Sequence, residues 1–329
     1  MKKIAIVTGG GGFIGSHMVD FLLKKKFKVR VIDNFSGGHK KNLAHHKNNN
    51  LLEIYKFNIL TLKDKKIFKD VDYVFHFAGI GDIVPSIEHP KKYMNVNVQG
   101  TINMLELCRN TNIKKFVYAA SSSCYGLASV PTKENHIISN MYPYALSKYL
   151  GEQSALHWSK VYNIPLNSIR IFNAYGTRVR TTGAYGAVFG VFFKQILENK
   201  PLTIVGDGNQ RRDFIYVTDL VRAFYLAATS KYNQQIYNVG AGNPQSINKL
   251  ANLIGGKKMI YLPKRPGEPE CTWANISKIK KEIKWKPLVS FEKGVKLMMS
   301  EINNWKKAPL WNKKNINKAT KTWFKYMSK

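Results

Sequence analysis

Short apolar runs alternate with longer amphipathic stretches through the first half of the chain. Runs of four to eight residues rich in Val, Ile, Phe and Tyr are typical of buried strands, whereas longer stretches with apolar residues three or four positions apart are typical of helices. The pattern predicts strands at 3–8, 28–33, 51–57, 72–78, 115–121 and 166–171, and helices at 13–25, 92–110 and 144–162. This alternation indicates an α/β fold with a Rossmann-type, doubly wound parallel sheet.

The alternation ends near residue 172, and shorter elements separated by glycines follow. We therefore expect one domain at 1–172 and a smaller C-terminal domain over most of 173–329, with segments near 213–240 packing back onto the first. The last residues are rich in Lys and Asn, but they carry Trp311, Trp323 and Phe324. These aromatic residues favour a docked helix over a free tail; contact of this helix with a membrane surface is the alternative.

A cluster of glycines directly follows the first predicted strand, with Gly9, Gly12 and Gly15 spaced three apart. Only glycine lets the backbone turn sharply and approach the phosphates of a ligand, and the next helix directs its free N–H groups at an anion. The second strand ends at Asp33, about twenty residues later, where a carboxylate would accept hydrogen bonds from the ribose of NAD. This order of elements predicts an NAD site, and a glycine-rich hairpin without a ligand is the alternative.

Composition is ordinary for a globular protein of 329 residues, with 44% hydrophobic residues, but the formal net charge is +32. Such a charge raises the hypothesis of nucleic-acid binding. The lysines are spread over the whole chain without a compact basic motif, so we expect no nucleic-acid partner. No apolar run is long enough to span a bilayer, and the first strand starts at residue 3, so we expect neither a membrane partner nor a leader. The three cysteines lack metal-ligand spacing and favour a reducing, cytoplasmic location.

Two groups of residues could carry chemistry. Tyr144 and Lys148 are four residues apart, which places them on one face of a helix. A nearby ammonium would lower the pKa of the phenol toward neutrality, where it can act as a general base; a solvated helix face is the alternative. Ser121, Ser122 and Ser123 follow the fifth strand, where ligands bind in doubly wound sheets, although serines also satisfy turn backbone groups.

Together these features resemble the extended short-chain dehydrogenase/reductase family. The first half carries the motifs Gly9-x-x-Gly12-x-x-Gly15, His76-Phe77-Ala78-Gly79, Ser121-Ser-Ser-Cys-Tyr-Gly126 and Tyr144-x-x-x-Lys148. The second half is similar to the nucleotide-sugar epimerase/dehydratase branch in Arg170-Ile-Phe-Asn173-Ala-Tyr-Gly176, Gly206 to Val217 and Lys264-Arg265-Pro-Gly-Glu268-Pro. The resemblance extends to about Trp305.

The resemblance implies NAD as the cofactor, a nucleotide sugar as the substrate of the C-terminal domain, and no metal. It implies that Ser121, Tyr144 and Lys148 are catalytic. The implied NAD-binding residues are Gly9, Gly12, Phe13, Ile14, Gly15, Asp33, Asn34, Asn58, Ile59, Phe77, Ala78, Gly79, Asn97, Tyr144 and Lys148. The implied substrate-binding residues are Ser122, Ser123, Asn173, Arg212, Arg265, Glu268 and Thr272. It also implies a homodimer joined through helices near 95–110 and 144–161.

Ser122 and Ser123 stand where family dehydratases carry an acid/base carboxylate pair. Their presence favours a 4-epimerase acting on UDP-glucose or UDP-N-acetylglucosamine for surface polysaccharide synthesis, by hydride removal at C4, a 4-keto intermediate and hydride return. The alternatives are a dehydratase or reductase of the same family, a UDP-glucuronate 4-epimerase, or a retired nucleotide-sensing or nucleic-acid-binding protein. A small Thr272 would leave room for an N-acetyl group, whereas Arg178 and Arg180 could pair with a uronate carboxylate. The sequence does not decide between an N-acetylated sugar and a uronate.

Overall fold

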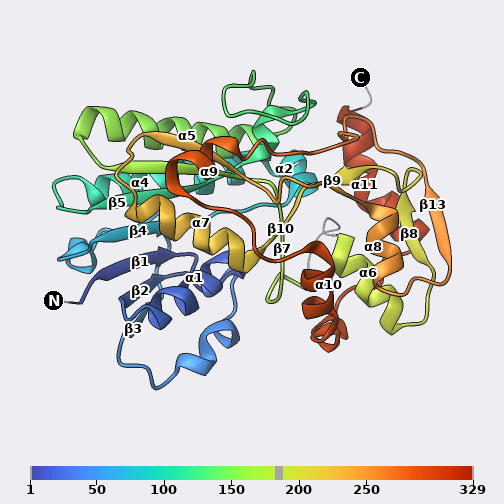
Figure 1. The fold of residues 1–329 in the computed structure, drawn as a ribbon, viewed down its shortest axis with the longest axis horizontal. Coiled ribbons are helices and arrows are strands. Elements are labelled where there is room, and N and C mark those ends of the chain that lie inside the picture. Colours follow the sequence, from blue (N-terminus) through green and yellow to red (C-terminus); the bar gives the residue numbers. More distant parts are fainter. Residues whose placement is uncertain (1, 182–187, 328–329) are drawn as a thin grey trace.

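The computed structural model describes residues 2–181 and 188–327 (Figure 1). The strands are β1 (Ile4–Thr8), β2 (Lys28–Ile32), β3 (Leu52–Tyr55), β4 (Tyr73–His76), β5 (Lys115–Ser121), β6 (Leu166–Ile171), β7 (Asn173–Tyr175), β8 (Leu202–Val205), β9 (Arg211–Arg212), β10 (Phe214–Tyr216), β11 (Gln235–Val239), β12 (Gln245–Ser246) and β13 (Met259–Leu262). The α-helices are α1 (Phe13–Lys24), α2 (Ile83–Glu88), α3 (Pro90–Met94), α4 (Gly100–Cys108), α5 (Pro143–Tyr162), α6 (Val188–Leu197), α7 (Val217–Thr229), α8 (Ile247–Leu253), α9 (Ser277–Ile283), α10 (Phe291–Met299) and α11 (Lys313–Met327).

Seven parallel strands form the main sheet in the order β11-β6-β5-β4-β1-β2-β3. The strand order reverses between β1 and β4, where Thr8 pairs with His76. Ligands of doubly wound sheets bind beyond the carboxyl ends of the strands at this reversal. The sheet therefore confirms the predicted fold class and places the glycine cluster at its ligand-binding edge.

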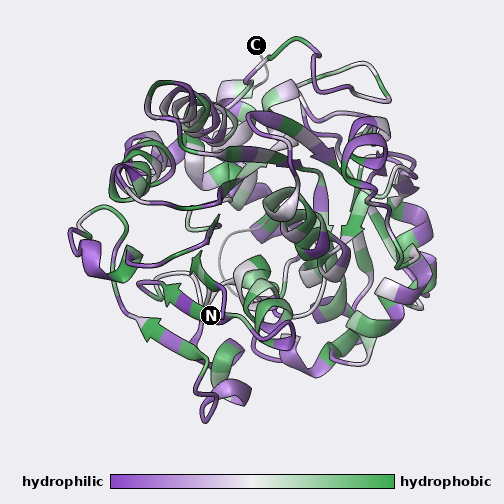
Figure 2. Cartoon of the chain, turned by 60° about the vertical axis from the view of Figure 1, so that its left-hand side comes forward, coloured by the Kyte–Doolittle hydropathy of each residue, from purple (hydrophilic) through white to green (hydrophobic). Residues whose placement is uncertain are grey.

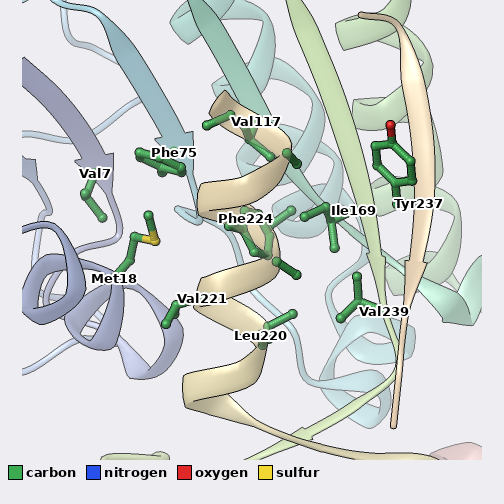
Figure 3. Packing of buried hydrophobic residues seen from close by; sticks show 14 of the residues in the cluster. Val7, Met18, Phe75, Val117, Ile169, Leu220, Val221, Phe224, Tyr237 and Val239 are labelled. Carbon is green, nitrogen blue, oxygen red and sulfur yellow. The ribbon is translucent and has the colours of Figure 1, made fainter. Parts of the chain in front are cut away.

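Helices cover both faces of the sheet, because parallel strands joined by crossover helices are buried on both sides. Helix α7 packs between α1 and the strands β5 and β6, and Phe224 lies near the centre of this core (Figure 3). The opposite face packs against α4 and α5, where Met104 and Ala155 meet Phe116 and Tyr118. In Figure 2 hydrophobic and hydrophilic residues alternate along the outer helices, as expected where one helix face is buried.

Two predicted strands, 115–121 and 166–171, agree with β5 and β6 to the residue, and the other four lie within a few residues of their predictions. The predicted helix at 92–110 differs more. It consists of α3, a π-helical turn at Asn95–Gln99 and α4. Such turns occur frequently at functional sites because they redirect side chains. Here the π-helical turn carries Asn97, which contacts the loop after β4.

The chain after residue 172 contributes to both halves of the molecule. Strand β11 pairs with β6 and completes the main sheet. The shorter strands form three two-stranded pairs, β7–β10, β9–β12 and β8–β13. Together with α6, α8 and α10 they enclose a second core rich in aromatic side chains, including Phe189, Phe193, Phe291 and Trp305. The pair β7–β10 thus lies where the two cores meet.

The C-terminal residues form the docked helix that their aromatic side chains predict. Helix α11 buries Ile316, Thr320 and Trp323, which are three or four residues apart. Nowhere in residues 2–181 and 188–327 is a helix both long and apolar enough to cross a membrane.

A buried histidine joins α1 to the loop after β7. His17 is 8% exposed, and its Nε2 donates to the carbonyl oxygen of Thr177 at 3.0 Å. Burial lowers the pKa of His17 to about 4, and the guanidinium of Arg178 adds to this effect. We expect the free energy of unfolding to fall as the pH drops from about 6.5 to about 4. Over this range His17 binds a proton in the unfolded chain but stays neutral in the folded protein. The loss should reach about 3 kcal/mol, measured by urea denaturation at several pH values.

His17→Gln is the matched control, since its amide can still donate to Thr177 but does not titrate in this range. The variant should lose less stability than the natural chain between pH 6.5 and pH 4. Parallel pH dependence of the two proteins would contradict the assignment.

Candidate active site

The glycine loop is held against the residues that follow β4. Gly9 has a φ of +67°, and a Cβ atom there would lie 2.8 Å from the backbone nitrogen of Ala78. A Cβ atom on Gly15 would lie 2.1 Å from the carbonyl oxygen of Gly9, so the start of α1 also needs glycine. Gly12 caps α1 without a side chain, which leaves the first-turn N–H groups of Phe13 and Ile14 without helical partners. This arrangement fits the diphosphate of NAD.

Asp33 connects the glycine loop to the end of β2. The carboxylate is 7% exposed and accepts hydrogen bonds from the backbone N–H groups of Gly11 at 2.9 Å and Phe35 at 2.6 Å. Each carboxylate oxygen keeps a second lone pair, so both can accept a ribose hydroxyl as well. Asn34 is exposed beside it, and its side-chain oxygen accepts from the N–H of Ser36.

The position of Asn58 differs from the sequence prediction, because β3 ends at Tyr55 and Asn58 lies in the turn beyond it. Asn58 is exposed and its side chain accepts from the N–H of Leu60, whereas Ile59 is buried against Gly100. The amide of Asn58 therefore shapes the turn, and its contact with adenine stays a prediction.

The loop after β4, which contains Phe77, Ala78 and Gly79, is clamped by Asn97. The amide oxygen of Asn97 accepts from the N–H of Ile80 at 2.9 Å, and its amide nitrogen donates to the carbonyl of Ile80 and to Ser147. The backbone N–H of Ala78 also donates to the hydroxyl oxygen of Thr8. Asn97 thus positions the loop, and the direct nicotinamide contact implied by the family stays a prediction.

Tyr144 and Lys148 occupy the first turns of α5 and both lie close to this loop. A Cβ atom on Gly81 would lie 4.0 Å from Oη of Tyr144, and one on Gly79 would lie 3.8 Å from Nζ of Lys148. Lys148 is 8% exposed, and its ammonium lies 4.5 Å from the centre of the Tyr118 ring. Burial lowers the pKa of Lys148 to about 8, against a smaller raising effect of Glu152.

The expected lowering of the Tyr144 pKa is wrong for this structure. Burial raises the pKa of the phenol above its usual value of 10, and the hydrogen bond from Ser121 lowers it by less. The physical reason is desolvation, which disfavours the phenolate, while Lys148 is not among the groups that shift this pKa. Tyr144 is therefore protonated at neutral pH in the unliganded protein.

The three serines after β5 have different surroundings. The hydroxyl of Ser121 faces Tyr144 and also accepts from the N–H of Ser123, so it combines the site role with the turn role that the sequence left open. Ser123 hydrogen-bonds the hydroxyl of Tyr142. Ser122 is partly exposed.

Sequence reasoning missed Tyr142. Its ring is parallel to that of Tyr144, with centroids 6.5 Å apart and planes 4° apart. Burial raises the pKa of Tyr142 to about 12, against the lowering effect of Ser123. Tyr142 is the residue just before α5, so neither helix periodicity nor the Tyr144–Lys148 spacing could single it out.

The predicted substrate residues Arg212, Arg265 and Glu268 come together. Arg212 donates to a carboxylate oxygen of Glu268 at 3.0 Å and to the carbonyl of Pro269 at 2.8 Å. The other oxygen of Glu268 lies 3.9 Å from a guanidinium nitrogen of Arg265. A cavity of about 230 Å³ adjoins this cluster, lined by Val205, Gly206, Asp207, Gln210, Arg212, Lys264, Glu268, Pro269 and Glu270. Arg212 lines this cavity, and Arg265 lines a neighbouring cavity of about 720 Å³. Two arginines joined through Glu268 suit a diphosphate.

Asn173 and Thr272 are paired with each other. The hydroxyl of Thr272 donates to the amide oxygen of Asn173 at 2.7 Å and accepts from the N–H of Asp213 at 3.2 Å. The Thr272 hydroxyl is therefore held by the protein itself, and room for an N-acetyl group beside it stays a prediction. Arg178 pairs with Asp20 at 2.6 Å and Arg180 pairs with Asp82. Contact of either arginine with a uronate carboxylate stays a prediction.

Asp20 is also the centre of a small polar cluster, because both His45 and His46 hydrogen-bond the same carboxylate oxygen at 2.9 and 2.8 Å. These three side chains offer atoms that could hold a metal ion. The pairing of Asp20 with Arg178 explains the cluster without one.

A buried ion pair lies beneath the catalytic candidates and was also missed. Glu152, one turn after Lys148 on α5, accepts hydrogen bonds from Arg170 at 2.6 to 3.2 Å and from Ser168 at 2.7 Å. Glu152 is 1% exposed and Arg170 is 3% exposed. Arg170 also donates to Tyr125, so the pair ties α5 to β6 and to the turn after β5.

Comparison with known proteins agrees with this geometry. Residues 5–240 match the model of the NAD dependent epimerase/dehydratase family. A putative UDP-glucose 4-epimerase of Methanocaldococcus jannaschii is 37% identical over 91% of this chain and 98% of its own length. Among solved structures, a UDP-N-acetylglucosamine 4-epimerase of Methanobrevibacter ruminantium, in complex with UDP-N-acetylmuramic acid, has a TM-score of 0.85 and 35% identity over 91% of this chain and 99% of its own. A UDP-glucuronic acid 4-epimerase of Bacillus cereus, in complex with UDP-glucuronic acid and NAD, has a TM-score of 0.85 and 33% identity over 92% of this chain and 99% of its own.

Proposed function

The chain belongs to the NAD-dependent epimerase/dehydratase family, and on this premise we propose that it inverts C4 of a UDP-sugar with NAD as its bound cofactor. The observation that carries the proposal is the position of Tyr144. Its hydroxyl is hydrogen-bonded by Ser121, faces the loop after β4 and lies on the same helix face as Lys148. The glycine loop and Asp33, which fit NAD, lie at the neighbouring strand end.

The residues of this chain would bind the sugar and move its proton. Ser121 and Tyr144 hold the C4 hydroxyl of the sugar, and Tyr144 takes its proton and later returns it. NAD bound by the glycine loop and Asp33 would supply the acceptor for the C4 hydride and the source from which it returns to the other face of the sugar. Because the phenol of Tyr144 is protonated in the unliganded protein, the positive charge that the oxidised cofactor would bring is needed to favour the phenolate that acts as a base.

Arg212, which lines the cavity of about 230 Å³, and Arg265 bind the diphosphate of the substrate, and Glu268 keeps the two guanidinium groups oriented. Asn173 supports this region through its bond to Thr272. A dehydratase would need carboxylates at the positions of Ser122 and Ser123 for acid/base elimination, and hydroxyls do not supply them at neutral pH.

Two further properties complete the proposal. We place the enzyme in the cytoplasm, because its cysteines Cys108, Cys124 and Cys271 are free thiols. We also propose a homodimer joined through α4 and α5. The outer side of α5 exposes Leu146 and Leu150, each 37% accessible, which a second copy would cover.

The direct test uses the purified protein and a panel of UDP-glucose, UDP-N-acetylglucosamine and UDP-glucuronate, each followed by proton NMR. We expect one of these sugars to invert at C4 without added NADH, and denaturation of the protein to release NAD. Consumption of NADH in proportion to product would instead indicate a reductase. Absence of inversion with every UDP-sugar of the panel would contradict the proposed activity.

A further inference from the structure

Helix α11 packs on the part of the molecule that carries the proposed substrate residues. It contacts α2, and the hydroxyl of Thr322 donates to the carboxylate of Glu88 at 3.0 Å (Figure 1). The indole N–H of Trp323 donates to the carbonyl oxygen of Pro266 at 2.8 Å. A Cβ atom on Gly267 would lie 3.4 Å from the terminal methyl of Met327. The helix therefore lies against the loop of residues 264–270.

Pro266 is the neighbour of Arg265 and lies two residues before Glu268. The hydrogen bond from Trp323 therefore fixes the backbone that positions the side chains of Arg265 and Glu268. This segment has little regular structure of its own. The segment borders a cavity of about 230 Å³ near Arg212 and a second cavity of about 720 Å³ near Leu127. Arg212 holds the later part of the segment through Glu268 and Pro269, and Trp323 adds a contact at Pro266, next to Arg265.

Trp323 also contacts Tyr142, whose ring lies beside the catalytic candidate Tyr144. The Trp323 ring lies 5.9 Å from that of Tyr142, and Tyr142 is parallel to Tyr144. Tyr142 also hydrogen-bonds Ser123, which lies two residues after Ser121. Trp323 is 4% exposed, so it fills the space between the loop and Tyr142 as a packed side chain.

We propose that Trp323 is a positioning residue for the nucleotide-sugar site: through Pro266 and Tyr142 it holds the 264–270 loop so that Arg265, oriented by Glu268, meets the diphosphate of the substrate. This rests on the proposed function for the identity of the substrate. Helix α11 follows the last family motif, Lys264-Arg265-Pro-Gly-Glu268-Pro, in the sequence.

The test compares Trp323→Ala with Phe324→Ala in the full-length protein. Phe324 is the next residue of the same helix and is 37% exposed, so its loss removes an aromatic ring without touching Pro266 or Tyr142. We expect Trp323→Ala to raise the KM for the UDP-sugar, and the Kd for UDP, by about tenfold, with kcat changed by less than about threefold. Phe324→Ala should leave both constants unchanged, and Trp323→Phe should recover part of the affinity because it keeps the ring but not the N–H donor.

The Kd for UDP, measured by calorimetry, separates this inference from the proposed activity. If no UDP-sugar is epimerised but UDP binding still weakens tenfold in Trp323→Ala, the positioning role stands and the activity fails. If the natural chain is active and Trp323→Ala binds UDP as tightly, the positioning role is overturned. Should Trp323→Ala not fold, hydrogen exchange on the natural chain decides. UDP should slow exchange in 313–327 together with 264–270, and protection of the loop alone would overturn the inference.

Discussion

Replacing Tyr144 with phenylalanine should lower kcat for C4 inversion by a factor of about 10²–10⁴, the usual contribution of a positioned acid/base group. The substitution keeps the ring, which is parallel to Tyr142 and meets Tyr93 edge to face. It removes only the hydroxyl that Ser121 hydrogen-bonds. The C4 proton then has no acceptor at this position, since Ser121 alone is too weak a base. NMR of the UDP-sugar that the natural chain converts measures the change.

Tyr162→Phe is the control, because Tyr162 is at the other end of the same helix and is 37% exposed. It should have natural kcat, and both variants should release as much NAD on denaturation as the natural chain. A Tyr144→Phe protein with kcat within a few-fold of natural would show that another group moves the proton.

The largest loss of stability is expected from Glu152→Ala, at about 3–5 kcal/mol of unfolding free energy. Arg170 would stay buried with a full charge and lose its carboxylate partner, and Ser168 would lose its acceptor. The low dielectric of the interior makes an unpaired charge far more costly than it would be at the surface. Urea denaturation followed by circular dichroism measures the difference.

Two comparisons test the explanation. Glu292→Ala breaks an exposed pair with Lys249, whose side chains are 50% and 43% accessible, and should cost at most about 1 kcal/mol. The double variant Glu152→Leu/Arg170→Met removes both charges and should be more stable than Glu152→Ala. Equal losses for Glu152→Ala and Glu292→Ala, or a double variant weaker than the single one, would contradict the role of the unpaired charge.

Much of the fold could be predicted because the signals are local. Strand β5 contains the apolar run 116–120, strand β6 combines Leu166, Ile169 and Ile171 with buried polar residues, and the limits of both match the prediction. The helix over 92–110 was harder, because a π-helical turn depends on what the side chains of that turn reach. Asn97 hydrogen-bonds the backbone of Ile80 across the site, and the hydrophobic pattern over 92–110 does not predict that contact.

By itself, the sequence determined the nucleotide-binding fold, the cofactor and the spacing of Tyr144 and Lys148. Glycine turns and helix periods depend on residues close together along the chain, so a linear pattern is enough to recognise them. The tertiary structure alone decided the pKa of Tyr144, the pairing of Thr272 with Asn173, and the contact of Trp323 with Pro266 and Tyr142. Each of these depends on desolvation or on contacts between segments distant in sequence, and both arise only when the chain is packed.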